Sequence, residues 1–252
     1  MTIFFLVVLG CAIGSFISVV VTRLNTQPGM IIGRSQCPHC HRRLVWYDMV
    51  PLVSFIALAG RCRYCKGSVS WWYPFLEVVS AAALVLWYRQ YGPGITIDEI
   101  GWLGMVFGFV TLAAYDARTL ILPDKIIAPM AVVAVLLALG RGDGVDTILP
   151  AAFLASSLFA ILYGVSRGSW VGFGDVKLAA LIGVLFSYQI TLTIVFLAIW
   201  LAAGVGAVLM LAGRATGKTP LPFGAFLATV AAIAILYINE FQFFTGFIPY
   251  IF

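Results

Sequence analysis

The chain has 252 residues, of which 62% are hydrophobic and only 10% are charged. A soluble domain of this size cannot bury so many apolar side chains in one core, so the composition excludes an ordinary soluble protein and indicates an integral membrane protein. The formal net charge of +5 is explained by membrane topology and by attraction to anionic lipid, so we expect membrane lipid and no nucleic acid as a partner.

Apolar runs recur along the chain, and a bilayer crossing needs about 20 such residues. The first run lacks a basic start and a cleavage site of small residues, so we interpret it as a retained span. The run Met49 to Gly60 is too short to cross and is expected to lie on the membrane or to fold within a loop. The pattern predicts an all-α polytopic membrane protein with about eight transmembrane helices, near residues 2–22, 74–90, 98–116, 122–139, 147–164, 174–188, 190–212 and 221–238.

The basic residues predict the orientation, because Lys and Arg collect on the cytoplasmic side of membrane proteins. Most of the 15 basic residues fall in the loop after the first run and in alternate later turns. We therefore expect both termini outside and the large loop in the cytoplasm. The predicted domains are a first transmembrane helix (1–22), a cytoplasmic loop domain (23–73), a transmembrane core (74–238) and an aromatic interfacial tail (239–252).

Four of the five cysteines form two Cys-x-x-Cys motifs in this loop: Cys37, Cys40, Cys62 and Cys65. Thiolates at this spacing suit a tetrahedral Zn²⁺, and a site with four protein ligands is structural rather than catalytic. The metal would stabilise a segment that is too small for its own core. Two disulfides are the alternative, which a reducing cytoplasm disfavours. His39 and His41 are interpreted as neighbours of this site, and Cys11 as a packing residue of the first span.

Two acids begin predicted spans. Glu77 lies just inside the second span, where we favour an ion pair with a loop arginine over a place in a polar pocket. Asp124 follows Pro123 at the start of the fourth span. Proline suits the first turn of a helix, and an acid there is favoured by the positive end of the helix dipole, so we interpret Asp124 as a cap.

Asp116 and Asp175 lie at the margins of the third and sixth spans, on the same predicted side of the membrane. An ionisable residue at such a place is costly and indicates function. Two carboxylates in one site can divide their roles, because one keeps its proton while the other ionises and activates water. The alternative is that each Asp only caps a helix.

Gly172 and Gly174 stand beside Asp175 in a Gly-x-Gly-Asp string. We expect them to allow close approach of the backbone and dihedral angles that other residues resist. Lys177 follows two residues after Asp175, where it either holds the charge of that acid or marks the cytoplasmic boundary.

With these residues assembled, the chain resembles the type IV prepilin leader peptidases, membrane aspartic proteases of the Gly-x-Gly-Asp group, over nearly its full length. The matching stretches are Gly14 to Leu24, Cys37 to Cys40, Leu44 to Leu52, Gly60 to Cys65, Tyr73 to Glu77, Asp116 with Leu122 to Asp124, Gly172 to Lys177, and Pro222 to Gly224. Met49, Val50 and Ala225 depart from the residues common in that family.

The resemblance implies an aspartic endopeptidase of the bacterial cytoplasmic (inner) membrane, with Asp116 and Asp175 as its catalytic acids. Its substrates would be prepilins or pseudopilins of type IV pilus or type II secretion systems, cleaved after a short basic leader. It also implies N-methylation of the new N-terminus with S-adenosylmethionine, an activity associated with the cysteine-bearing loop. No glycine-rich fingerprint for that cofactor is visible. Asp48, Glu77 and Asp124 are the remaining acids on the predicted cytoplasmic side, and we expect at least one to bind the leader.

Two other classes of function are weighed against this one. A proton- or ion-coupled transporter would use Asp116 and Asp175 as relay carboxylates and the zinc loop as a gate. It predicts internal repeats and helices broken near the midplane, whereas we find no repeat and both acids lie near one edge. An inert membrane scaffold would give no reason for two acids at one depth. The sequence specifies no oligomeric state.

Overall fold

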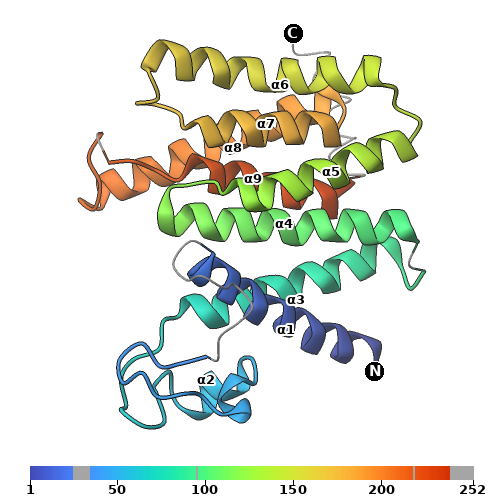
Figure 1. The fold of residues 1–252 in the computed structure, drawn as a ribbon. Helices are drawn as coiled ribbons and strands as arrows, with labels where there is room; N and C mark the ends of the chain where they lie inside the picture. The colour runs from blue at the N-terminus through green and yellow to red at the C-terminus, as the bar shows by residue number, and fades with distance from the viewer. Residues whose placement is uncertain (25–34, 95, 218, 239–252) are drawn as a thin grey trace. The chain divides into compact units, whose positions relative to one another are not determined.

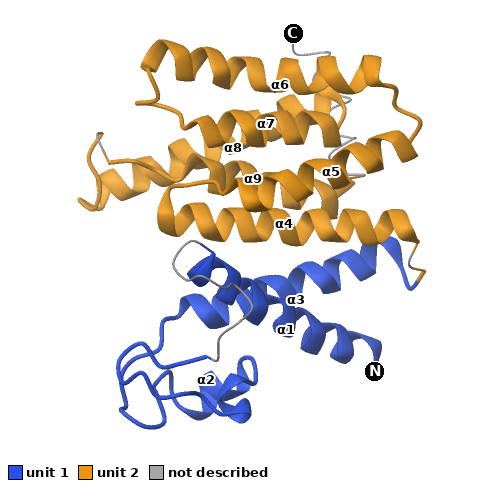
Figure 2. Cartoon of the chain, in the orientation of Figure 1, with its two compact units in different colours: residues 1–93 blue, residues 94–252 orange. Residues whose placement is uncertain are grey.

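The computed structural model describes residues 1–24, 35–94, 96–217 and 219–238 (Figure 1). The described chain is all-helical apart from two isolated β-bridges. It divides into two compact units, Met1–Pro93 and Gly94–Phe252 (Figure 2). The predicted interfacial tail, residues 239–252, lies outside the described residues.

Unit 1 is built on two crossing helices, α1 (Thr2–Arg23) and α3 (Trp72–Tyr91). Gly10 and Gly14 lie one turn apart on the face of α1 that meets α3. A Cβ added at Gly10 would overlap the backbone of Ala81, and one at Gly14 would overlap the backbone of Leu76 and Glu77. Small residues at this spacing let two helix backbones approach closely, as is common between membrane helices.

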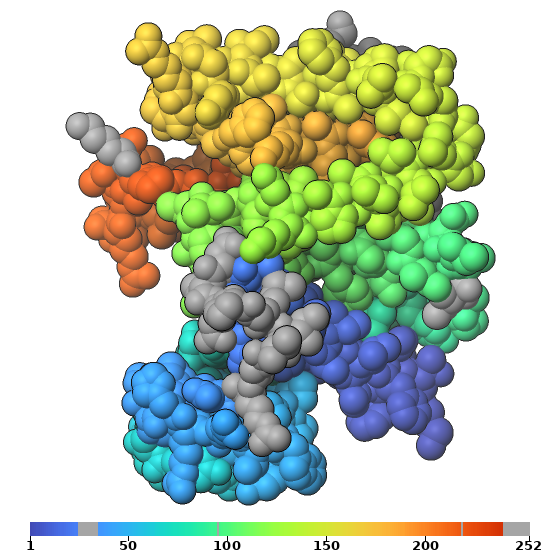
Figure 3. All heavy atoms as spheres, viewed as in Figure 1, coloured from blue at the N-terminus to red at the C-terminus, as the bar shows by residue number. Residues whose placement is uncertain are grey.

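The loop between these helices carries a 3₁₀-helix, η1 (Trp46–Met49), and the short helix α2 (Val53–Ala57). Phe55 of α2 packs edge-on against Trp71, with 4.8 Å between ring centroids. In the space-filling view, the described part of the loop forms a rounded lobe (Figure 3). The short apolar run therefore folds within the loop, which was one of its two predicted places.

Unit 2 contains six helices among its described residues, and the chain passes back and forth along the bundle (Figure 1). Helix α4 packs against α5 and α9, α7 packs against α5, α6 and α9, and α8 packs mainly against α9. Their bounds are α4 (Ile97–Thr119), α5 (Asp124–Gly140), α6 (Val145–Ser166), α7 (Phe173–Leu185), α8 (Tyr188–Leu211) and α9 (Phe223–Leu236).

Local sequence explains where these helices begin. Thr96 and Glu99 form a capping box at the start of α4, in which each side chain accepts a hydrogen bond from the other residue's backbone N–H. Pro123 precedes the first residue of α5, as its missing N–H and restricted φ favour. Only Phe186 and Ser187 separate α7 from α8.

Each of the eight predicted spans coincides with one helix of the described chain, but four of these helices are long and apolar enough to cross a membrane: α1, α4, α6 and α8. Helix α7 has 13 residues, which at 1.5 Å per residue is about 20 Å, short of the roughly 30 Å of a hydrocarbon core. Eight crossings therefore remain a prediction.

Candidate active site and metal centre

Asp116 and Asp175 approach each other within unit 2. Asp116 lies in the last turn of α4 and Asp175 in the first turn of α7, and both are buried. A Cβ built on Gly224, in the first turn of α9, would lie 3.1 Å from Asp116 Oδ2 and 3.0 Å from Asp175 Oδ1. These two distances add to an upper limit of about 6 Å between the two oxygens, a separation at which carboxylates influence each other's ionisation.

Backbone N–H groups hold one oxygen of each acid. Ala225 N donates to Asp116 Oδ2 at 2.7 Å, and Gly172 N donates to Asp175 Oδ2 at 3.1 Å. Asp175 therefore does cap its own helix, as the alternative interpretation expected. Capping uses only Oδ2, and Oδ1 is the atom that lies beside Gly224 and the Asp116 carboxylate.

The glycines of this region act through packing. A Cβ on Gly174 would lie 2.8 Å from Leu122 Cβ, and one on Gly224 would lie 2.7 Å from Leu122 Cδ1. The predicted close approach is therefore found at Gly174. The prediction of unusual dihedral angles is wrong, because Gly172 has φ −76° and ψ 151° and Gly174 lies inside α7. Any residue type can adopt such angles.

Lys177 pairs with Asp124 rather than with Asp175. The Lys177 Nζ atom lies 2.6 Å from Asp124 Oδ1 and 5.0 Å from the centroid of the Phe173 ring. Asp124 is the first residue of α5, and no side chain caps that helix through a hydrogen bond, so its interpretation as a cap is wrong. The pair joins the first turn of α5 to the second turn of α7.

The four loop cysteines come together in unit 1. The sulfur atoms of Cys37, Cys40, Cys62 and Cys65 all lie within 4.8 Å of one another. Cys37 Sγ and Cys65 Sγ are 3.7 Å apart, far longer than a disulfide bond of about 2.05 Å. Four sulfurs around Zn²⁺, each at about 2.3 Å, would be about 3.8 Å apart. The four thiols are unbonded to one another, so this donor set fits a metal ion and not the disulfide alternative.

The two Cys-x-x-Cys motifs have the same backbone geometry. In each, the N–H four residues after the first cysteine donates to that cysteine's carbonyl, from His41 to Cys37 and from Lys66 to Cys62. His41 and Lys66 both have positive φ, 53° and 59°. The backbone N–H groups of Cys65 and then Tyr64 hydrogen-bond the Cys62 sulfur and lower its pKa to about 6. At Cys65, a backbone hydrogen bond from Gly67 is outweighed by burial and by the neighbouring cysteine side chains, which raise the pKa of this thiol to about 11.

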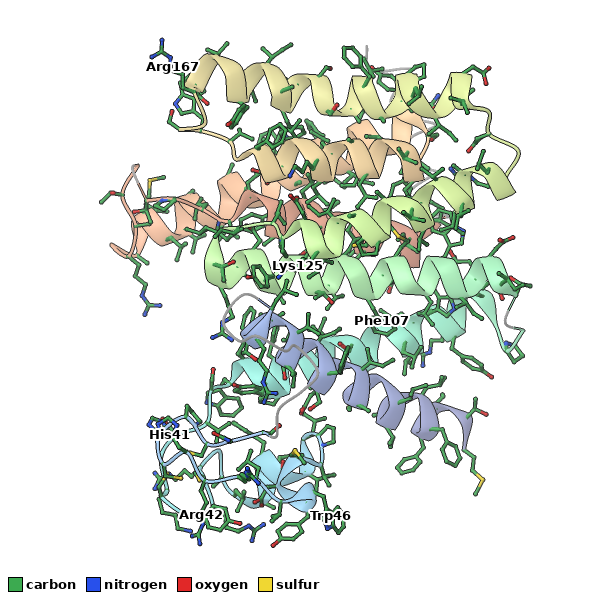
Figure 4. All side chains as sticks on the ribbon, viewed as in Figure 1. His41, Arg42, Trp46, Phe107, Lys125 and Arg167 are labelled. Atoms are coloured by element: carbon green, nitrogen blue, oxygen red, sulfur yellow. The ribbon has the colours of Figure 1, made fainter. Side chains whose placement is uncertain are left out.

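The histidines lie around this cluster and not within it. His39 Nε2 is 3.2 Å from the carbonyl oxygen of Ser68. The group of residues that could ligate a metal contains neither His39 nor His41. Figure 4 shows His41, Arg42 and Trp46 on the outside of the loop segment. Arg42 stacks over the Tyr64 ring at 4.5 Å and so links the two motifs.

The other predicted acids lie in unit 1. Asp48 pairs with Arg63 at 2.8 Å. Glu77 accepts a hydrogen bond from Leu52 N at 2.8 Å and one from the Ser15 side chain. Among the described residues Glu77 has no arginine partner, so the favoured ion pair is wrong and the polar-pocket alternative holds. The close crossing of α1 and α3 buries this carboxylate.

The described chain is all-helical and has helices apolar enough to cross a membrane. It also holds a buried pair of carboxylates and a cluster of four cysteines. These features define a helical membrane protein with polar groups buried between apolar helices. Two family models match it: the Bacterial Peptidase A24 N-terminal domain over residues 8–91 and the Type IV leader peptidase family over residues 102–207. The chain belongs to the type IV leader peptidase family, as its motifs indicated.

Its relatives match over most of their length. The prepilin leader peptidase/N-methyltransferase of Dickeya chrysanthemi is 32% identical, over 92% of this chain and 91% of its own. Proteins of the same description from Burkholderia pseudomallei strain K96243 and Bacillus subtilis strain 168 are 29% and 28% identical, covering 98% and 92% of this chain and 89% and 93% of their own. No solved structure gives a significant match to the chain.

Sequence reasoning missed the part that α9 plays at the carboxylate pair. Gly224 leaves the space beside both acids, and Ala225 supplies the N–H that Asp116 accepts. Pro222-Phe223-Gly224 was recognised only as one of the stretches that match the family, with no part assigned to it at the carboxylate pair. The sequence feature that could have indicated this role is Gly224 at the start of a predicted helix, because the backbone N–H groups of a helix start are free to bind an acid.

We predict that Cys62→Ser abolishes metal binding. The wild-type protein should carry about one Zn²⁺ per chain, and removing one thiolate of a four-thiolate site should reduce this toward zero and lower the stability of the loop. Metal content of the purified protein is measured by inductively coupled plasma mass spectrometry. Cys11→Ser is the matched control, because Cys11 lies in α1 outside the cluster, and it should keep the metal. A metal-free wild type would contradict the prediction.

Proposed function

We propose that the chain is an aspartic endopeptidase that removes the short basic leader from prepilins or pseudopilins. The observation that carries the proposal is the approach of two buried carboxylates, Asp116 and Asp175, from different helices to one point beside Gly224. Membership of the leader peptidase family supports the same reaction. A purely structural role would not require two acids from distant parts of the chain to meet in an apolar bundle.

The proposed reaction divides the work between the acids. One carboxylate is ionised and takes a proton from water, while the other keeps its proton and donates a hydrogen bond to the carbonyl oxygen of the scissile bond. The water oxygen bonds to the carbonyl carbon, and the C–N bond then breaks as the leaving amine takes a proton. The N–H groups of Ala225 and Gly172 orient the acids before substrate binds.

We propose that the reaction takes place at the cytoplasmic face of the bacterial inner membrane, with both termini outside. The positions of the basic residues favour this orientation. A prepilin presents its basic leader to the cytoplasm and its apolar helix to the bilayer, so its cleavage site would lie at the membrane margin. Asp116 and Asp175 lie at the ends of apolar helices, as such a substrate requires.

We further propose that the enzyme methylates the new N-terminus with S-adenosylmethionine. The relatives' description as prepilin leader peptidase/N-methyltransferase supports this second activity. In this proposal residues 23–73 are a cytoplasmic domain that Zn²⁺ stabilises through Cys37, Cys40, Cys62 and Cys65, and the protease core lies within residues 74–238. The bound methyl donor supplies an activated methyl group, and the protein's part is to bind and orient it.

Asp124 is our candidate for binding the leader. Among the three acids predicted for this role, it is the one in the same unit as the carboxylate pair, and it follows Leu122, which contacts the point where the pair meets. Its side chain is 68% exposed although it pairs with Lys177. A basic residue of the leader could therefore replace Lys177 as its partner.

The catalytic assignment predicts that Asp116→Asn and Asp175→Asn each slow leader release by about 10²- to 10⁴-fold, the range that general acid–base groups contribute. Asn keeps the size of Asp and can accept the same backbone hydrogen bond, so the fold and substrate binding should be retained. Cleavage of a synthetic prepilin by protein purified in detergent measures the rate. Asp98→Asn, at the other end of α4, is the control. Near-normal cleavage by either single variant would refute the assigned roles.

Gly224→Ala should lower the cleavage rate by as much as about 10²-fold, because displacement of a reacting group by about 1 Å can have that effect. The new methyl group would be 3.0–3.1 Å from an oxygen of each acid and 2.7 Å from Leu122, so the carboxylates or α9 must move. Gly104→Ala in α4 is the control, since a Cβ there meets nothing within 4 Å. Equal cleavage rates for the two variants would contradict this role of Gly224.

The leader assignment predicts that Asp124→Asn raises KM for a prepilin by about two- to fivefold, the scale of an exposed charge pair. The value of kcat should change little, and the effect should shrink at high salt. Lys177→Gln removes the competing cation and should leave KM unchanged or lower it. If both variants raise KM equally, the ion pair matters only for structure and Asp124 does not bind the leader.

A further inference from the structure

A groove of about 490 Å³ lies on unit 2 between α5 and α7, two helices that pack side by side (Figure 1). One end of the groove carries the ion pair of Asp124 and Lys177, and the rest of its lining is apolar. The apolar part is formed by Ile127, Ala128, Ala131, Val135, Ala180, Leu181 and Val184. The groove is therefore charged at one end and apolar along its length.

The groove has the length and the side chains of a surface that could hold another helix. From Asp124 to Val135, α5 advances by about 16 Å, which is three helical turns. Ala128 and Ala131 of α5 and Ala180 of α7 are small residues in its lining. Small residues let the backbones of membrane helices approach closely, and such packing is what holds helices together in lipid. A helix in this groove would insert the side chains of one face, spaced three and four residues apart.

The charged end of the groove lies at nearly the same depth as the carboxylate pair. Lys177 follows Asp175 by two residues, which is about 3 Å along the axis of α7 and about 200° around it. The groove and the Asp175 carboxylate therefore lie on different sides of α7. A helix is about 10 Å wide with its side chains, and three extended residues span about that distance. Extended segments on the two sides of a scissile bond could thus each reach from the acids to the charged end of the groove.

We propose that this groove binds the apolar helix of the prepilin substrate, with Asp124 at the end that receives the basic leader. The inference rests on the proposed peptidase function and adds the surface that holds the part of the substrate retained in the product. The order of the charges supports this occupant, because an acid followed by an apolar groove complements a basic leader followed by an apolar helix. A lipid acyl chain and a second copy of this chain are the competing occupants.

The experiment uses the full-length protein in detergent with two substrates, a prepilin and a shorter peptide that has the leader and the scissile bond but no apolar helix. Ala131→Leu places a larger side chain in the groove. It should lower kcat/KM for the prepilin by about tenfold more than for the peptide, since even one methylene in an apolar site changes discrimination by about 10- to 200-fold. Ala203→Leu is the matched control, because Ala203 is an exposed alanine of α8 outside the groove. It should keep the wild-type ratio of the two kcat/KM values.

A crosslinking test covers the case in which Ala131→Leu does not fold, which thermal unfolding would reveal. A photoreactive amino acid replaces Ala128, which is exposed in the lining of the groove, in full-length Asp175→Asn protein that binds prepilin without releasing the leader. Irradiation should join this probe to the apolar helix of the prepilin. The same probe in place of Ala203 should give no such product.

The outcomes separate this inference from the proposed function. If the wild type cleaves the prepilin and Ala131→Leu keeps the wild-type ratio, or if the probe in place of Ala128 labels only lipid or a second copy of the chain, the groove assignment is overturned while the peptidase assignment stands. Equal kcat/KM values of the wild type for prepilin and peptide would also overturn it, because the enzyme would then make no use of the helix. If the wild type releases the leader from neither substrate, the proposed function fails and this inference fails with it.

Discussion

The arrangement of unit 2 depends on the absence of a side chain at Gly224. A Cβ there would contact Leu122 and both carboxylates at 2.7–3.1 Å, closer than packed atoms normally approach. Because Gly224 lacks one, the first turn of α9 lies directly against the end of α4 and the start of α7. The same approach brings Ala225 N within 2.7 Å of Asp116 Oδ2. One glycine thus permits both the meeting of the acids and the hydrogen bond that orients one of them.

Helix ends also explain how two acids can be buried so close together. Asp116 accepts its hydrogen bond at the N-terminus of α9, and Asp175 accepts one at the N-terminus of its own helix α7. Helix N-termini have unpaired N–H groups and the positive end of the helix dipole, so they stabilise nearby negative charge. Lys177 is engaged by Asp124, whereas the N-terminal N–H groups of α7 and α9 are directed at the pair.

The sequence predicted the two side-chain clusters of the protein, the carboxylate pair and the four cysteines. Asp116 and Asp175 stood out because acids are rare in apolar runs, and the four cysteines because their spacing suits one metal. The parts it could not predict depend on backbone contact and on helix crossing. The N–H of Ala225 has no signature in sequence, and the burial of Glu77 follows from how Gly10 and Gly14 let α1 approach α3. The dihedral angles expected for Gly172 and Gly174 were wrong, because Gly172 has ordinary extended angles and Gly174 is needed for space and not for rotation.

The four-cysteine cluster and a cavity of unit 1 share residues, which links their stability. Cys37 and Cys62 line the cavity, and Arg63, next to Cys62, holds the Asp48 carboxylate at 2.8 Å. A loop of this size cannot order itself through an apolar core, so metal binding at the four cysteines would supply much of its folding free energy. Loss of the metal would therefore release Arg63, Asp48 and the cavity wall together. The carboxylate pair lies in unit 2 and is held by helix packing and backbone N–H groups, so the two chemistries proposed for this chain have separate structural supports.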